Sequence, residues 1–195
     1  MTFANYFTLI RILLAPIFLI ISLYHKELGV NELYLPIVLI TIAIVSEFSD
    51  AADGFFARKF NQVTDFGKLI DPLADSIFKL TIFLSFTQSI VKAPLFFVMI
   101  IFYRDALVST LRSVCALKGF ALAARKSGKL KAVFLAFVAF SVLLLQIFYN
   151  MRMVTLSFLQ DYAYYSLMVC AIYAFVTGFE YFYVNRLFIR KALRK

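Results

Sequence analysis

The sequence predicts an all-α membrane protein with six transmembrane helices and cytoplasmic N- and C-termini, and three observations support this. Of the 195 residues, 63% are hydrophobic and the mean hydropathy is +0.88, whereas a soluble domain is usually about half apolar. The apolar residues form long stretches, and a helix of about 20 such residues crosses a bilayer. Basic residues gather in alternate connecting segments. We therefore expect a single membrane domain over residues 1–195.

Short polar segments or prolines separate the expected helices. The first helix contains Arg11 near its start, where the side chain is expected to snorkel to the membrane interface. The fifth helix should follow a basic segment, and residues 150–161 should form a loop before the sixth. The expected ranges are 6–24, 34–59, 65–89, 95–117, 132–149 and 162–184.

The basic residues also predict the orientation. With the N-terminus inside, the inner segments hold fourteen basic residues and the outer loops hold three, and the richer segments are expected on the cytoplasmic side. We expect a protein of the cell (inner) membrane whose functional site faces the cytoplasm. This topology and contact with anionic membrane lipid explain the net charge of +9, so we expect no nucleic-acid partner.

Four of the seven aspartates form two closely spaced pairs between positions 50 and 75. Asp50 and Asp53 are three residues apart, and Asp71 and Asp75 are four apart, so each pair lies on one face of its helix. Apolar stretches flank both pairs, and one aspartate at the centre of a membrane helix costs about 2.5–3.5 kcal/mol on insertion scales. The four carboxylates should therefore face a wet or cation-filled cavity near the membrane surface.

A bound cation would offset the repulsion among these carboxylates. Hard oxygen ligands favour Mg²⁺, Mn²⁺ or Ca²⁺, and two such ions suit four carboxylates. Gly54 and Ala57 keep the adjoining helix face small, while Arg58 adds a cation able to grip a phosphate. Together these residues fit a diphosphate-bearing substrate, because metals that bridge a diphosphate act as Lewis acids. The plainer interpretation is a set of helix caps and surface charges.

The motif resembles the signature of a known family, the CDP-alcohol phosphatidyltransferases. It reads Asp-x2-Asp-Gly-x2-Ala-Arg-x8-Gly-x3-Asp-x3-Asp, with fixed residues at Asp50, Asp53, Gly54, Ala57, Arg58, Gly67, Asp71 and Asp75. The resemblance implies a six-helix, usually homodimeric membrane enzyme that uses CDP-diacylglycerol, releases CMP and holds two divalent metals, Mg²⁺ or Mn²⁺.

The same resemblance implies a role for each motif residue. Asp50, Asp53 and Asp71 are expected to bind metal. Asp75 is expected to bind metal and also to act as the base that takes the proton from the acceptor hydroxyl. The residues expected to contact the CDP moiety are Gly54, Ala57, Arg58 and Thr64.

A second group of basic residues favours a phosphorylated acceptor. Arg104 and Arg112 lie eight residues apart, close to one face of an apolar helix, and charges in such a helix call for a partner. Lys129 and Lys131 begin the next expected helix on the same side. We expect these four residues to bind the acceptor phosphate.

Further segments resemble a bacterial branch of the family that transfers the phosphatidyl group to glycerol 3-phosphate, giving phosphatidylglycerophosphate. That branch commonly has a lysine directly after the last aspartate, where this chain has Ser76 and, one turn later, Lys79. The segments that carry the resemblance are the opening Asn5-x-x-Thr8-x-x-Arg11, 61–67, 103–112, 127–131 and 178–183.

Alternatives stay open at this point. The acceptor could be inositol phosphate or another alcohol, and the arginines could pair with Asp105 or Glu47. A divalent-cation transporter would also use intramembrane aspartates. Transport, however, favours carboxylates on several helices near the membrane midplane, whereas all four lie in one expected helical hairpin near its cytoplasmic end.

Overall fold

The computed structural model consists of six α-helices, with no strand among the residues it describes, which are 3–59, 65–117 and 126–193. The all-α prediction is confirmed. The helices are α1 (Phe3–Tyr24), α2 (Leu35–Lys59), α3 (Asp65–Gln88), α4 (Leu95–Leu117), α5 (Lys126–Asn150) and α6 (Leu156–Leu193). The side chains at 3–7, 51, 53–59, 65–69, 71–72, 116–117, 126, 188 and 190–193 lie outside the description.

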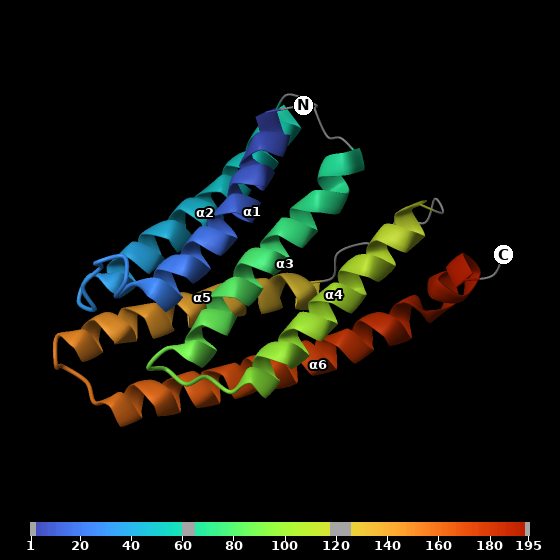
Figure 1. Ribbon diagram of the computed structural model, residues 1–195. Helices are drawn as coiled ribbons and strands as arrows, with labels where there is room; N and C mark the ends of the chain where they lie inside the picture. The colour runs from blue at the N-terminus through green and yellow to red at the C-terminus, as the bar shows by residue number, and fades with distance from the viewer. Residues whose placement is uncertain (1–2, 60–64, 118–125, 194–195) are drawn as a thin grey trace.

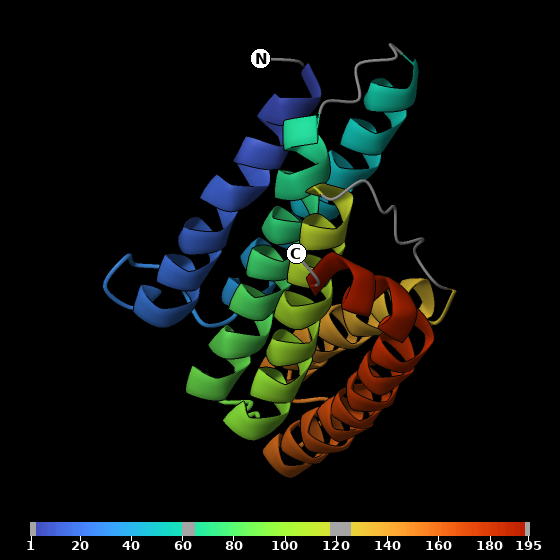
Figure 2. The ribbon, with the colours of Figure 1, turned by 90° about the vertical axis from the view of Figure 1, so that its right-hand side faces the viewer.

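The helices form a bundle in which α1 packs against α2 and α3, and α6 packs against α4 and α5 (Figure 1). Contacts of α3 with α4, and of α2 with α5, join the two halves. The start of α1, the end of α2, the start of α3 and the end of α4 lie toward one end of the bundle (Figures 1 and 2). The segments that carry the aspartate motif therefore meet at this end.

Buried residues recur every three or four positions along each helix, as expected for one packed face. On α1 this face contains the polar residues Thr8, Arg11 and Ser22 as well as Ala15 and Phe18. The buried face of α6 is built largely of small residues, which let the neighbouring helices approach closely. These small residues are Ala163, Cys170, Ala171, Ala174 and Thr177.

Within the described ranges, two stretches are long and apolar enough to cross a membrane, Ser127–Asn150 in α5 and Leu156–Leu187 in α6. A shorter apolar stretch, Thr8–Tyr24, forms most of α1. These helices indicate that the protein associates with a membrane. Six membrane crossings and cytoplasmic termini stay predictions.

The predicted start of the fifth helix and both predicted ends of the sixth were wrong. Helix α5 begins at Lys126, and α6 begins at Leu156 and continues to Leu193, so the expected loop at 150–161 is much shorter. Hydropathy identifies only the apolar part of a helix. The helix itself can extend into polar sequence, because its ends depend on how the terminal backbone groups are capped. Thr155 supplies such a cap, because its Oγ1 accepts a hydrogen bond from the Phe158 backbone N–H at 3.3 Å.

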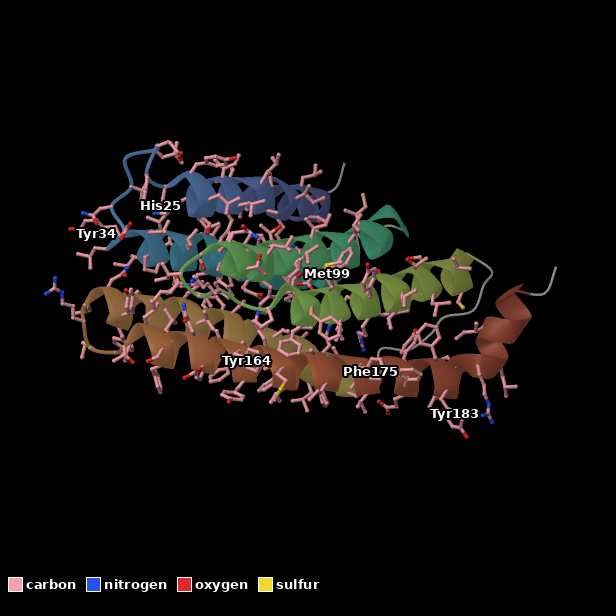
Figure 3. All side chains as sticks on the ribbon, turned by 60° about the horizontal axis from the view of Figure 1, so that its bottom comes forward. His25, Tyr34, Met99, Tyr164, Phe175 and Tyr183 are labelled. Atoms are coloured by element: carbon pink, nitrogen blue, oxygen red, sulfur yellow. The ribbon has the colours of Figure 1, made fainter. Side chains whose placement is uncertain are left out.

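The opposite end of the bundle is tied by hydrogen bonds from side-chain amides. Asn150 Nδ2 donates to the Glu32 carbonyl at 2.6 Å, and Gln160 Nε2 donates to the Ile90 carbonyl at 2.8 Å. His25 and Tyr34 lie at this end, and Tyr183 lies near the other end of the bundle (Figure 3). The one histidine of the chain is therefore remote from the end where the aspartate motif lies.

The close packing of α6 predicts that enlarging Ala174 will destabilise the protein. Ala174 is fully buried, so Ala174→Leu should lower the free energy of unfolding by about 1–3 kcal/mol through overpacking. Val176→Leu, at a side chain that is 57% exposed, is the control and should change it by less than about 0.5 kcal/mol. Thermal unfolding in detergent measures both, and equal shifts would contradict this packing.

Candidate functional site

The aspartate motif spans the end of α2 and the first half of α3. Asp50 and Asp53 lie in α2, and Asp71 and Asp75 lie in α3, as the sequence predicted for a helical hairpin. Of these four side chains, those of Asp50 and Asp75 are described. Of the other predicted metal or CDP contacts, Thr64 lies outside the described residues, and only the helical backbone is described at Asp53, Gly54, Ala57, Arg58 and Asp71.

Asp50 is paired with an arginine from another helix. Arg11 of α1 donates from Nη1 to Asp50 Oδ1. The arginine side chain is only 2% exposed, whereas the Asp50 side chain is 51% exposed. The expectation that Arg11 snorkels to the interface was therefore wrong, because its charge is compensated inside the bundle by an aspartate.

Asp75 is paired with a lysine one turn later on its own helix. Lys79 Nζ lies 2.6 Å from Asp75 Oδ1, and these side chains are 15% and 38% exposed. Glu47 of α2 lies within electrostatic range of both pairs, since it interacts with Arg11, Asp50, Asp75 and Lys79. These five residues form one group, which we call the carboxylate cluster.

Asp105 joins two basic residues into a second group. Arg104 Nη1 donates to Asp105 Oδ1 at 3.0 Å, and Lys131 Nζ of α5 donates to the same oxygen. The exposed fractions of the three side chains are 12% for Arg104, 18% for Asp105 and 5% for Lys131. This group, which we call the cationic cluster, has a formal charge of +1 and links α4 to α5.

The structure separates the four predicted acceptor residues into two pairs. Arg104 and Lys131 converge on Asp105, whereas the side chains of Arg112 and Lys129 are exposed. Lys129 is two residues from Lys131, a spacing that directs two side chains to different faces of a helix. Tyr181 of α6 is within electrostatic range of both Arg104 and Arg112.

Two buried donors near the cationic cluster lack a hydrogen-bond partner in the described part of the chain. They are Arg104 Nε and the Tyr181 hydroxyl. Buried polar groups are normally satisfied, and leaving one unpaired costs about 1–3 kcal/mol. The arrangement can therefore accept an anion with several hydrogen-bond acceptors, such as a phosphate.

A small cavity of about 10 Å³ lies between the two clusters. Ser76 and Lys79 of α3 line one side, and Asp105 of α4 lines the other. A cavity of this size holds about one water molecule. The carboxylate and cationic clusters are thus close neighbours at the contact of α3 with α4.

The described donors suit a hard divalent cation. Asp50 and Asp75 offer carboxylate oxygens on side chains that remain partly exposed, and Mg²⁺ and Mn²⁺ prefer such ligands. Among the described side chains, no three acidic, histidine or cysteine groups form a metal site. The other two predicted ligands, Asp53 and Asp71, lie outside that set.

Sequence reasoning missed the roles of three residues, Arg11, Lys79 and Asp105, in these clusters. For Arg11 a signal existed: it shares the buried face of α1 with Thr8, Ala15 and Phe18, at helical spacing. For Lys79 the spacing of four from Asp75 was the signal. Asp105 was considered only as a neutralising partner, and its bond to Lys131 joins two helices that no sequence pattern places together.

Comparison with known proteins places this site in a family. The model of the CDP-alcohol phosphatidyltransferase family matches residues 1–177, so the chain belongs to that family, and the predicted enzyme class is confirmed. The structure's helical hairpin of aspartates is consistent with this membership.

Among its relatives are bacterial proteins named CDP-diacylglycerol–glycerol-3-phosphate 3-phosphatidyltransferase. The protein of Bacillus subtilis (strain 168) is 36% identical over 187 residues, covering 93% of each chain. That of Rickettsia typhi is 31% identical over 180 residues, covering 91% of this chain and 93% of the relative. That of Treponema pallidum is 33% identical over 155 residues, covering 74% and 69%. The expected similarity to this bacterial branch is confirmed.

The buried position of Arg11 predicts a large effect on stability. Arg11→Met removes the cation beside Asp50 and should lower the free energy of unfolding by about 1.5–3 kcal/mol, the range for hydrogen bonds to charged groups. Lys26→Met is the control, because Lys26 and Glu32 pair at 3.0 Å with side chains 74% and 67% exposed. An exposed pair contributes about 0–1 kcal/mol. Thermal unfolding that shows the same loss for both variants would contradict this assignment.

Proposed function

We infer that the protein transfers the phosphatidyl group from CDP-diacylglycerol to glycerol 3-phosphate, releasing phosphatidylglycerophosphate and CMP. The observation that carries this is the adjacency of the two clusters: Lys79, which pairs with the partly exposed Asp75, and Asp105, which pairs with the buried Lys131, line opposite sides of one small cavity. A metal-bound diphosphate and a phosphorylated acceptor need such neighbouring sites. Family membership and the names of the relatives give the same reaction.

The carboxylate cluster is the proposed metal and diphosphate site. Asp50, Asp53, Asp71 and Asp75 would hold two Mg²⁺ or Mn²⁺ ions, which supply Lewis-acid stabilisation of the diphosphate charge when bound. Arg11 pairs with Asp50, and Lys79 pairs with Asp75, so each cation would help to hold its carboxylate in position. The proposed contacts with the CDP moiety are Gly54, Ala57, Arg58 and Thr64.

Asp75 is the proposed general base. Its carboxylate would take the proton of the acceptor hydroxyl as that oxygen attacks the phosphatidyl phosphorus and CMP leaves. Lys79, at 2.6 Å from Oδ1, orients the carboxylate. Lys79, the partner of Asp75, lines the small cavity that Asp105 of the cationic cluster also lines, and this supports a base near the proposed acceptor site.

The cationic cluster is the proposed site of the acceptor phosphate. Asp105 neutralises one of the two charges of Arg104 and Lys131, and the remaining positive charge favours an anion. The unpartnered Nε of Arg104 supplies a directed donor. Arg112 and Lys129, at exposed positions, would attract the phosphate and complete its binding. A phosphorylated acceptor is thereby favoured over a neutral alcohol.

The membrane arrangement belongs to the proposal as well. Six crossings with cytoplasmic termini would place the site at the cytoplasmic face of the inner membrane, where the basic segments are expected. The protein would work among membrane lipids as a homodimer, as the family resemblance implies.

The direct test is to incubate the purified protein with CDP-diacylglycerol and Mg²⁺, offer glycerol 3-phosphate, inositol phosphate or glycerol, and measure CMP release. We expect CMP with glycerol 3-phosphate. EDTA should abolish the release and excess Mg²⁺ should restore it, because the diphosphate charge is then stabilised again. CMP release that is unaffected by EDTA would refute the proposed metal site. CMP release with inositol phosphate and not with glycerol 3-phosphate would refute glycerol 3-phosphate as the acceptor.

Removing the proposed base should affect the chemical step. Asp75→Asn should lower kcat for CMP release about 100-fold or more, the usual contribution of general acid–base catalysis. Asp161→Asn is the control, because Asp161 is exposed near the start of α6, outside both clusters. An unchanged kcat in Asp75→Asn would show that Asp75 is not the general base.

Removing the proposed phosphate ligand should affect acceptor binding. Arg104→Ala should raise the KM for glycerol 3-phosphate about tenfold or more, because a hydrogen bond to a charged group contributes about 1.5–3 kcal/mol. The KM for CDP-diacylglycerol should change little. Equal increases in both KM values would argue against a separate acceptor site at Arg104.

A further inference from the structure

Arg104 passes between two glycines that belong to different helices. A Cβ atom at Gly178 of α6 would lie 3.1 Å from Arg104 Cγ and 4.0 Å from its Cβ. A Cβ atom at Gly128 of α5 would lie 3.7 Å from Arg104 Nη2. The stem of the side chain therefore rests against Gly178, and the guanidinium lies near Gly128.

The backbone does not require glycine at position 178. It lies inside α6, and Gly29 is the one glycine of the described part with a positive φ, +70°. A glycine within a helix lowers helix stability relative to alanine. What Gly178 provides is the space that a methyl group would otherwise take.

Arg104 has little freedom to move away from a larger residue. Its side chain is 12% exposed, and its far end is held by Asp105, which also holds Lys131. Because Cγ lies near the root of the side chain, a displacement there changes the direction of the whole guanidinium. Tyr181, one turn along α6, is also within electrostatic range of Arg104.

We propose that Gly178 is a positioning residue that sets the location of the Arg104 guanidinium and thereby the affinity for the phosphate of the acceptor. Gly178 touches no substrate itself. It admits the arginine stem against α6, so that the guanidinium reaches Asp105 with its remaining donors directed at an anion. This inference rests on the proposed function of Arg104 as a ligand of the acceptor phosphate.

The first test compares two identical substitutions beside the same side chain. Gly178→Ala should raise the KM for glycerol 3-phosphate about threefold to tenfold, with kcat and the KM for CDP-diacylglycerol nearly unchanged. Gly128→Ala places its methyl group at an ordinary contact distance and should change the acceptor KM less. A larger effect of Gly128→Ala, or a Gly178→Ala effect on kcat alone, would overturn the proposal.

The second test removes the side chain that Gly178 accommodates. In an Arg104→Ala background there is nothing for the added methyl group to displace, so Gly178→Ala should have no further effect on the acceptor KM. Thermal unfolding should show the same coupling: Gly178→Ala lowers Tm with Arg104 present and does not lower it with Ala at 104. Equal effects of Gly178→Ala in both backgrounds, including failure of both proteins to fold, would overturn the proposal.

The two measurements also separate this inference from the proposed function. If Arg104→Ala leaves the acceptor KM unchanged while the Tm coupling is present, Gly178 positions Arg104, but the arginine does not bind the acceptor; the link to acceptor affinity is then overturned. If Arg104→Ala raises the acceptor KM and Gly178→Ala does not, the acceptor site stands and the positioning role of Gly178 is overturned.

Discussion

Charge compensation inside an apolar helical bundle is the constraint on which the rest of this structure depends. Burying an unpaired charge costs several kcal/mol, and a pair is tolerated when its geometry is good. Arg11 on α1 meets Asp50 on α2, and Lys131 on α5 meets Asp105 on α4. Each of these pairs joins two helices, so the residues that fix the packing also hold the carboxylates and cations of the site.

Most of the fold could be predicted from hydropathy and breaks in the sequence. The expected ranges 34–59 and 95–117 agree with α2 and α4 within one residue, because polar or proline-containing segments adjoin these helices. The ends of α5 and α6 could not be predicted in the same way. Their apolar stretches continue into polar sequence that remains helical, and the Thr155 cap that starts α6 is a local feature with no hydropathy signal.

The part of the site whose residues belong to one short segment of the sequence, the aspartate motif, could be predicted. The spacing of Asp50 and Asp75 within one motif placed both on a helical hairpin, and the structure brings their neighbours Arg11, Lys79 and Glu47 together. The cationic cluster was predicted less completely. The pairing of Lys131 with Asp105 connects α4 to α5, and sequence spacing carries no information about which helices a side chain connects.

The hydrogen bonds from the side-chain amides at the far end of the bundle determine where a movement of α6 would have its largest effect. Asn150 and Gln160 attach these ends of α5 and α6 to the interhelical turns through neutral groups, whereas ion pairs connect the helices at the site end. A rotation of α6 about these hydrogen bonds would displace the residues beside Arg104 far more than those beside Ile90, because displacement grows with distance along a rigid rod.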